Sequence, residues 1–184
     1  AWRDWMTNRW VPTIHALQAQ RGDAPEEYSR LIAETGAQTT LICTALLPGD
    51  APQQVRVELL AVGDAEAFHV EREDGRWVVR QAFPFSAPDQ FGAQPAMLAT
   101  IDSPQWREHS WQHRATQTLT AQVGDRVVLT SDTLAEWLLH DRDARMRQLL
   151  ALQDEADFER LIEQERQAGQ MKDDDVTLLI IPML

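Results

Sequence analysis

Acidic residues stand where an apolar segment ends, and the clearest example is the segment at residues 126–130. Asp132 follows this segment and Ser131, and Glu136 comes four residues after Asp132. A carboxylate at a strand end is held by rigid backbone, and a residue four positions further along a helix faces the same side. The spacing indicates two oxygen ligands for a hard cation. The alternative is that Asp132 caps a helix near Leu134.

Two other acidic positions have the same placement. Asp173, Asp174 and Asp175 are consecutive and precede the apolar segment 176–181. Adjacent carboxylates repel one another unless they are solvated or share a cation, so a solvated turn and a cation site both stay open. Asp64 follows Gly63, a residue that lets the backbone bend sharply after an apolar segment. If these strand ends lie next to one another in the fold, their carboxylates would together bind one divalent ion.

Other reactive side chains give weaker signals. His109 and His113 are four residues apart without a clear helical pattern, which favours ordinary surface histidines over a zinc site. Ser131 has no nearby His/Asp set to activate it as a nucleophile. The single cysteine, Cys43, lies in an apolar run without basic neighbours, so we expect it to be buried and unreactive. A lone cysteine forms no internal disulfide and favours a cytoplasmic protein.

Length and composition predict one folded domain over residues 1–184. The apolar fraction is 43% and the charged fraction 25%, as in folded soluble proteins. The net charge of −12 opposes binding to nucleic acids and to anionic membranes, which attract basic surfaces. No apolar run reaches the roughly 18 to 20 residues of a membrane span, and the first residues do not resemble a signal peptide.

Strands and helices are predicted in blocks, which favours an α+β layered domain. Asp74-Gly75 predicts a hairpin turn, and the first four strands with their short links predict an antiparallel meander. Residues 81–113 predict a long loop with helical turns over one end of the sheet. The predicted strands are 39–47, 55–62, 67–70, 77–79, 115–121, 126–130 and 176–181, and the predicted helices are 1–20, 25–36, 134–140, 144–152 and 157–167.

In their order and spacing, these motifs resemble the motif series of type 2C protein phosphatases, and more closely that of bacterial members of the family. The resemblance covers residues 37–182, most of the chain. It rests on Thr39-Thr40-Leu41, Ala61-Val62-Gly63-Asp64-Ala65, Gly124-Asp125 with Ser131-Asp132, Asp174-Asp175-Val176-Thr177, and the loop Ala82-Phe83-Pro84-Phe85 with Asp89 and Phe91.

The resemblance implies a four-layer αββα sandwich of two antiparallel sheets flanked by helices, with Mg²⁺ or Mn²⁺ between the sheet ends. It implies that Asp132 and Asp174 bind the core metal and that Asp64 and Glu136 bind an additional, weaker one. The implied reaction is hydrolysis of phosphoserine or phosphothreonine in a phosphoprotein by metal-activated water.

The sequence departs from the family pattern at three places. Thr133 replaces a glycine and Ala65 replaces a serine. The family's N-terminal Glu-Asp and Asp-Gly-x-Gly-Gly motifs have no counterpart, so we expect residues 1–22 to be the helix that follows them. On this expectation the fold is incomplete at its N-terminus, a missing segment or a partner chain completes the site, and this chain alone is inactive.

Two other functions stay open. One is a catalytically inactive phosphatase-like module that binds a phosphoprotein or a regulatory partner, which the replacements at Thr133 and Ala65 favour. The other is an unrelated acidic α+β interaction domain in which the aspartate motifs are structural.

Overall fold

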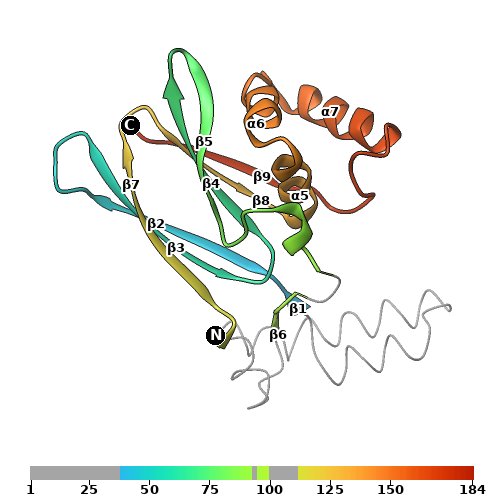
Figure 1. Ribbon diagram of the computed structural model, residues 1–184, viewed down its shortest axis with the longest axis horizontal. Coiled ribbons are helices and arrows are strands. Elements are labelled where there is room, and N and C mark those ends of the chain that lie inside the picture. Colours follow the sequence, from blue (N-terminus) through green and yellow to red (C-terminus); the bar gives the residue numbers. More distant parts are fainter. Residues whose placement is uncertain (1–37, 93–94, 100–111) are drawn as a thin grey trace, which may run out of the picture. The chain divides into compact units, whose positions relative to one another are not determined.

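The computed structural model describes residues 38–92, 95–99 and 112–184, so the helices predicted within 1–37 lie outside the described residues (Figure 1). The chain divides into two compact units, and the prediction of a single domain stays a prediction. In the first unit, β1 (Gln38–Thr39) pairs with β6 (Leu98–Ala99) in antiparallel fashion. The first unit comprises Ala1–Thr39 and Met97–Gln112, and the second comprises Thr40–Ala96 and His113–Leu184.

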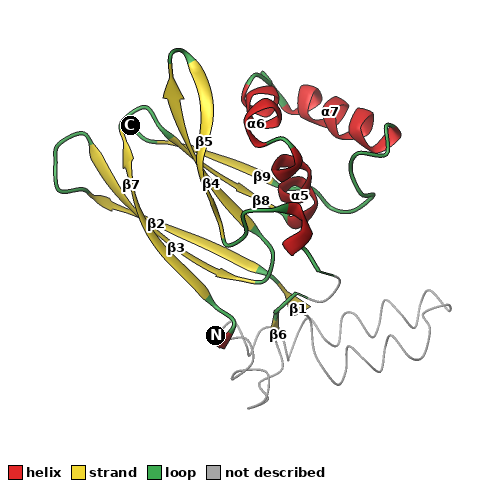
Figure 2. Cartoon of the chain, in the orientation of Figure 1, coloured by secondary structure: helices red, strands yellow, loops and turns green. Residues whose placement is uncertain are grey.

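Two antiparallel sheets form the second unit (Figure 2). Every predicted strand is confirmed, with small changes at its ends. The three-stranded sheet has the order β2 (Leu41–Pro48), β3 (Gln54–Val62), β7 (Ala115–Gln122), and the four-stranded sheet has the order β5 (Arg76–Phe83), β4 (Glu66–Glu73), β8 (Arg126–Thr130), β9 (Leu178–Pro182).

The predicted meander of the first four strands is wrong, because the chain changes sheets between β3 and β4. Gly63 makes this change with a φ of +98°, a region that side chains with a Cβ rarely adopt. A Cβ on Gly63 would also lie 2.5 Å from Cγ2 of Thr40 and 2.7 Å from the carbonyl oxygen of Ala96. The predicted hairpin turn between β4 and β5 is confirmed, with φ of 47° at Asp74 and 80° at Gly75.

Three helices cover one face of the four-stranded sheet (Figure 1). They are α5 (Asp132–His140), α6 (Arg142–Leu150) and α7 (Glu155–Gln167), and each begins two residues before its predicted start. The early starts carry little apolar signal, because the two residues added to each helix, Asp132-Thr133, Arg142-Asp143 and Glu155-Ala156, include at least one charged residue. Leu134, Trp137 and Leu138 of α5 are buried in one core with Phe68 and Val128 of the sheet.

A second core lies between the two sheets. It contains Val57 and Leu59 of β3 together with Ala67 of β4 and Leu129 of β8. The described residues therefore form a helix layer and two sheet layers, which confirms the prediction of an α+β fold with two antiparallel sheets and flanking helices.

Three smaller findings complete the fold. Cys43 is exposed, so its predicted burial is wrong: its neighbour Ile42 packs against the core between the sheets, and alternation along β2 turns Cys43 outward. In the predicted loop 81–113, the described part contains the end of β5, the 3₁₀ turn η2 (Pro88–Gln90) and β6. None of the helices among the described residues combines the length and the apolar character needed to cross a bilayer.

Candidate acidic metal centre

The segments that carry three of the predicted ligands adjoin one residue, Thr130 at the end of β8. Thr130 pairs with Glu66 at the start of β4 and with Leu178 at the start of β9. Asp64 lies just before β4, Asp132 comes two residues after Thr130, and Asp174 lies in the segment that leads into β9. The antiparallel register therefore brings three acidic turns to the same end of the four-stranded sheet.

Ser131 joins two of these turns. Its backbone N–H donates to the carbonyl oxygen of Thr177 at 3.1 Å, and its hydroxyl accepts from the N–H of Thr177 at 3.1 Å. The same hydroxyl donates to the carbonyl oxygen of Asp175 at 3.3 Å. Ser131 also occupies the N-cap position of α5, with Asp132 as the first helical residue, so the alternative of Asp132 as the cap is wrong.

Arg166 of α7 fixes the segment that contains Asp174. Its guanidinium donates to the carbonyl oxygen of Lys172 at 3.3 Å and to that of Asp174, and it lies 3.6 Å from the carboxylate of Asp173. The carboxylate of Asp174 accepts the N–H of Asp175 at 2.8 Å. Hydrogen bonds from Arg166 and from the N–H of Asp175 thus fix the backbone around Asp174.

The predicted ligands act on one another electrostatically. Burial raises the pKa of Asp64, which is 5% exposed, and the nearby charge of Asp132 raises it further, whereas Lys172 lowers it. The ammonium group of Lys172 lies 2.5 Å from Oε2 of Glu136. This contact raises the pKa of Lys172, and the charges of Asp132 and Asp174 add to the effect. The ammonium group of Lys172 therefore contacts Glu136 and interacts electrostatically with the other three carboxylates, and the assignment of all four as metal ligands stays a prediction.

Glu66 is a further acidic residue at this sheet end, and the sequence analysis missed it. Its side chain is fully buried, and both of its oxygens accept the N–H of Phe85, at 3.0 and 3.3 Å. Burial raises the pKa of Glu66 to about 9, and the charge of Asp64 adds to this rise. The available signal was its position two residues after Asp64 in the otherwise apolar segment 65–68, since such spacing along an extended chain keeps side chains on one side.

A pocket of about 250 Å³ opens beside Glu136 and Lys172. Thr133, which stands where the family has glycine, lines this pocket and is 2% exposed. Its hydroxyl has no hydrogen-bond partner among the described residues. The other lining residues are Trp137, His140, Gly169, Gln170 and Met171.

The donor set of the acidic cluster fits a hard divalent cation. Asp64, Asp132, Glu136 and Asp174 offer only carboxylate oxygens, the ligands that Mg²⁺ and Mn²⁺ favour. Lys172 neutralises one of these four charges, which leaves an excess of negative charge for a divalent ion.

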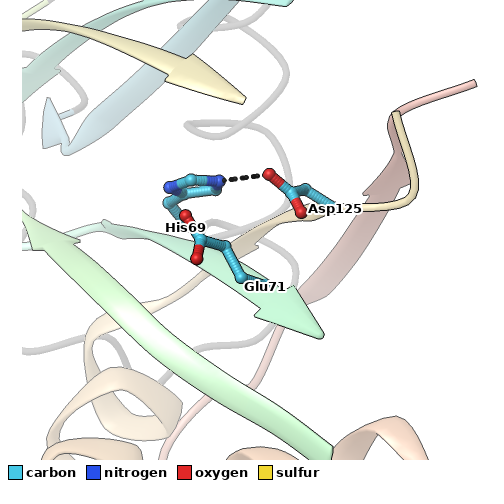
Figure 3. Close-up of side chains that lie close together, drawn as sticks. All are labelled: His69, Glu71 and Asp125. Atoms are coloured by element: carbon cyan, nitrogen blue, oxygen red, sulfur yellow. Dashed lines mark hydrogen bonds and ion pairs between the residues drawn. The ribbon is translucent and has the colours of Figure 1, made fainter. Parts of the chain in front are cut away.

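His69, Glu71 and Asp125 form a separate group whose ligand atoms lie within 4.8 Å of one another (Figure 3). His69 Nε2 and Asp125 Oδ2 are 2.9 Å apart, and both residues are buried. Asp125 also accepts the N–H of Gln122 at 2.7 Å, and Glu71 pairs with Arg80 at 2.6 Å. These contacts give each of the three side chains a partner within the protein and tie the turn before β8 to β4, so we interpret the group as structural.

No family model matches the sequence, and no curated protein matches it. Among solved structures, the chain is similar to the phosphatase domain of the cell fate determinant SpoIIE from Bacillus subtilis, with a TM-score of 0.43 and 15% identity over 94% of this chain and 73% of that one. It is also similar to the catalytic domain of the serine threonine protein phosphatase PstP in complex with two manganese ions, with a TM-score of 0.44 and 21% identity over 83% of this chain and 63% of that one.

Proposed function

We propose that this chain is part of a metal-dependent phosphatase domain that hydrolyses phosphoserine or phosphothreonine in a protein substrate. The observation that carries the proposal is the strand register at Thr130, which brings acidic turns from distant parts of the sequence to the same end of the four-stranded sheet. The motif order described above supports the same activity. The cytoplasmic location predicted from the sequence is part of this proposal.

In the proposed site, Asp132 and Asp174 hold a core Mg²⁺ or Mn²⁺, and Asp64 and Glu136 hold a second, weaker ion. A bound divalent ion supplies a Lewis acid for phosphate oxygens and lowers the pKa of water. The chain positions the ligands. Ser131 links the turn of Asp132 to the segment of Asp174, and the burial of Asp64 strengthens its attraction to a cation.

Replacing Asp132 tests the proposal. In the intact polypeptide, Asp132→Asn should lower Mn²⁺-dependent hydrolysis of para-nitrophenyl phosphate by more than about 100-fold, because an amide removes a negative charge from the core ligand set. The matched control is Asp173→Asn, since Asp173 belongs to the same acidic run but its side chain is 96% exposed. Full activity in Asp132→Asn would remove Asp132 from the mechanism, and equal losses in both variants would indicate a general charge effect.

The second candidate is a catalytically inactive phosphatase-like module that binds a phosphoprotein. The ion pair between Lys172 and Glu136 favours it, because a cation of the chain already engages one of the proposed ligands. Binding of a phosphorylated peptide without turnover in the presence of Mn²⁺ would support this module, whereas turnover would exclude it.

A further inference from the structure

Lys172 is the only lysine in the sequence. The rest of the 17 Lys and Arg residues are arginines. It lies between α7 and β9, next to the buried Met171. Arg166 holds the carbonyl oxygen of Lys172, so the backbone is fixed at this point. The side chain of Lys172 is 66% exposed, which leaves its ammonium group free to exchange a carboxylate partner for water.

The charge of Lys172 acts on all four proposed ligands. Its ammonium group pairs with Glu136 at 2.5 Å, and it interacts with Asp132, Asp174 and Asp64. Glu136 belongs to the proposed weaker metal position, and its side chain is 25% exposed. The contact is therefore partly open to solvent, so an arriving ion can reach it.

An ammonium group and a divalent ion compete for these oxygens. Lys172 brings one charge on a flexible stem and forms single, non-chelating contacts. A divalent ion brings two charges and binds several oxygens at once, but it must overcome repulsion from a cation that is already present. An arginine would hold a carboxylate with a rigid planar fork, whereas lysine is more readily displaced.

We propose that Lys172 is a tethered counter-ion of the acidic cluster, and that divalent metal ions bind there in competition with its ammonium group. Lys172 neutralises part of the cluster before metal binds and sets the metal concentration at which the site fills. Loss of its charge, by substitution or by acylation of the amine, raises metal affinity. This inference rests on the proposed function, since it concerns the same metal site.

Calorimetric titration of the intact polypeptide with MnCl₂ tests the inference. Lys172→Met keeps the length of the side chain and removes its charge, and it should bind Mn²⁺ about three- to tenfold more tightly than the unsubstituted chain. Lys172→Arg keeps the charge and should not bind more tightly. Arg76→Met changes the net charge by the same amount at an exposed position of β5 and should leave the affinity unchanged.

Thermal unfolding gives an independent measurement. In EDTA, Lys172→Met should melt below the unsubstituted chain, because the carboxylates lose their counter-ion. In saturating Mn²⁺, its melting temperature should rise by more than that of the unsubstituted chain, since tighter binding to the folded state stabilises it further. Acetylation of the unsubstituted chain should change its melting temperatures in EDTA and in Mn²⁺ in the same way as Lys172→Met does. Acetylated Lys172→Met is the control for reaction at other amines.

The outcomes separate the inference from the proposed function. Equal Mn²⁺ affinity in the unsubstituted chain and Lys172→Met would overturn the inference and leave the metal site intact. An equal gain in Lys172→Arg and Lys172→Met would also overturn it, because the charge would then be irrelevant. No Mn²⁺ binding by either the unsubstituted chain or Lys172→Met would overturn the metal site itself.

Discussion

At the scale of single residues, Asp64 and Glu66 are two buried carboxyl groups that respond differently to their surroundings. Asp64 is close to Asp132 and to the ammonium group of Lys172, so it belongs to the ionic cluster. Glu66 is fully buried, and its pKa of about 9 keeps it protonated near neutral pH in the metal-free chain. Its contact with the N–H of Phe85 instead ties the chain after β5 to the start of β4.

The raised pKa of Glu66 predicts a dependence of stability on pH. In EDTA, Glu66 should ionise in the unfolded chain near its ordinary pKa of 4.5 and in the folded chain only near 9. The folded state therefore holds an extra proton between these values, so this contribution to stability is fully present below pH 4.5 and is lost as pH rises towards 9. Glu66→Gln does not titrate, and the unsubstituted chain should lose stability relative to it by about 1 kcal/mol per pH unit across this window.

Urea unfolding at pH 5, 6.5 and 8 measures this difference. The control is Glu58→Gln, because Glu58 is exposed on β3 and forms a surface ion pair with Arg56. Parallel pH profiles for the unsubstituted chain and Glu66→Gln would contradict the prediction.

At the scale of elements, turns decide where the acidic side chains lie. Gly63 directs the chain from one sheet to the other and so places Asp64 at the start of β4. Ser131 positions the turns that carry Asp132 and Asp174, because its three hydrogen bonds join the end of β8 to the segment before β9. The cluster thus depends on contacts made outside the regular strands.

Substitution of Gly63 tests the importance of its turn. Gly63→Ala should lower the free energy of unfolding by about 2 to 4 kcal/mol, because it adds a steric clash to an unfavourable φ. The control is Gly124→Ala, since Gly124 has nearly the same φ, +99°, but a Cβ there would meet no atom within 4 Å. That control should lose only about 1 to 2 kcal/mol. Equal losses in chemical denaturation would show that the contacts with Thr40 and Ala96 do not constrain the turn.

At the scale of the whole second unit, β4 and β8 belong to both cores. Phe68 and Val128 face the helices, whereas Ala67 and Leu129 face the three-stranded sheet. Alternation along the same two strands therefore couples the helix layer to the sheet layer. The acidic cluster lies at the end of these shared strands, so its geometry depends on both cores.

This coupling predicts that the helices and the two sheets of the second unit unfold together. Leu138→Ala in the core beneath the helices and Leu59→Ala in the core between the sheets should each destabilise this unit by about 2 to 5 kcal/mol. Both variants should shift a single transition in circular dichroism, because the shared strands leave neither layer independent. Early melting of helical signal in Leu138→Ala, with the sheet signal unchanged, would contradict the coupling.

The sequence by itself predicted most of the secondary structure of the described residues and the four carboxylates of the candidate site. The predictions of secondary structure succeed because alternation, helical spacing and turn residues are local properties, whereas the assignment of the four carboxylates as metal ligands stays a prediction. Gly63-Asp64 and Asp74-Gly75 are examples in which the residue type alone indicates the backbone conformation. The fold class followed from the motif resemblance together with the grouping of strands and helices.

Tertiary structure decided what depends on residues far apart in the chain. Assignment of β3 and β4 to different sheets, the burial of Glu66 and His69, and the outward orientation of Cys43 all depend on which faces pack together. The position of Lys172 among the carboxylates is of the same kind, because it depends on the pairing of β8 with β9 and on the contacts of Arg166. Burial and charge proximity are properties of packed surfaces, and a linear pattern does not contain them.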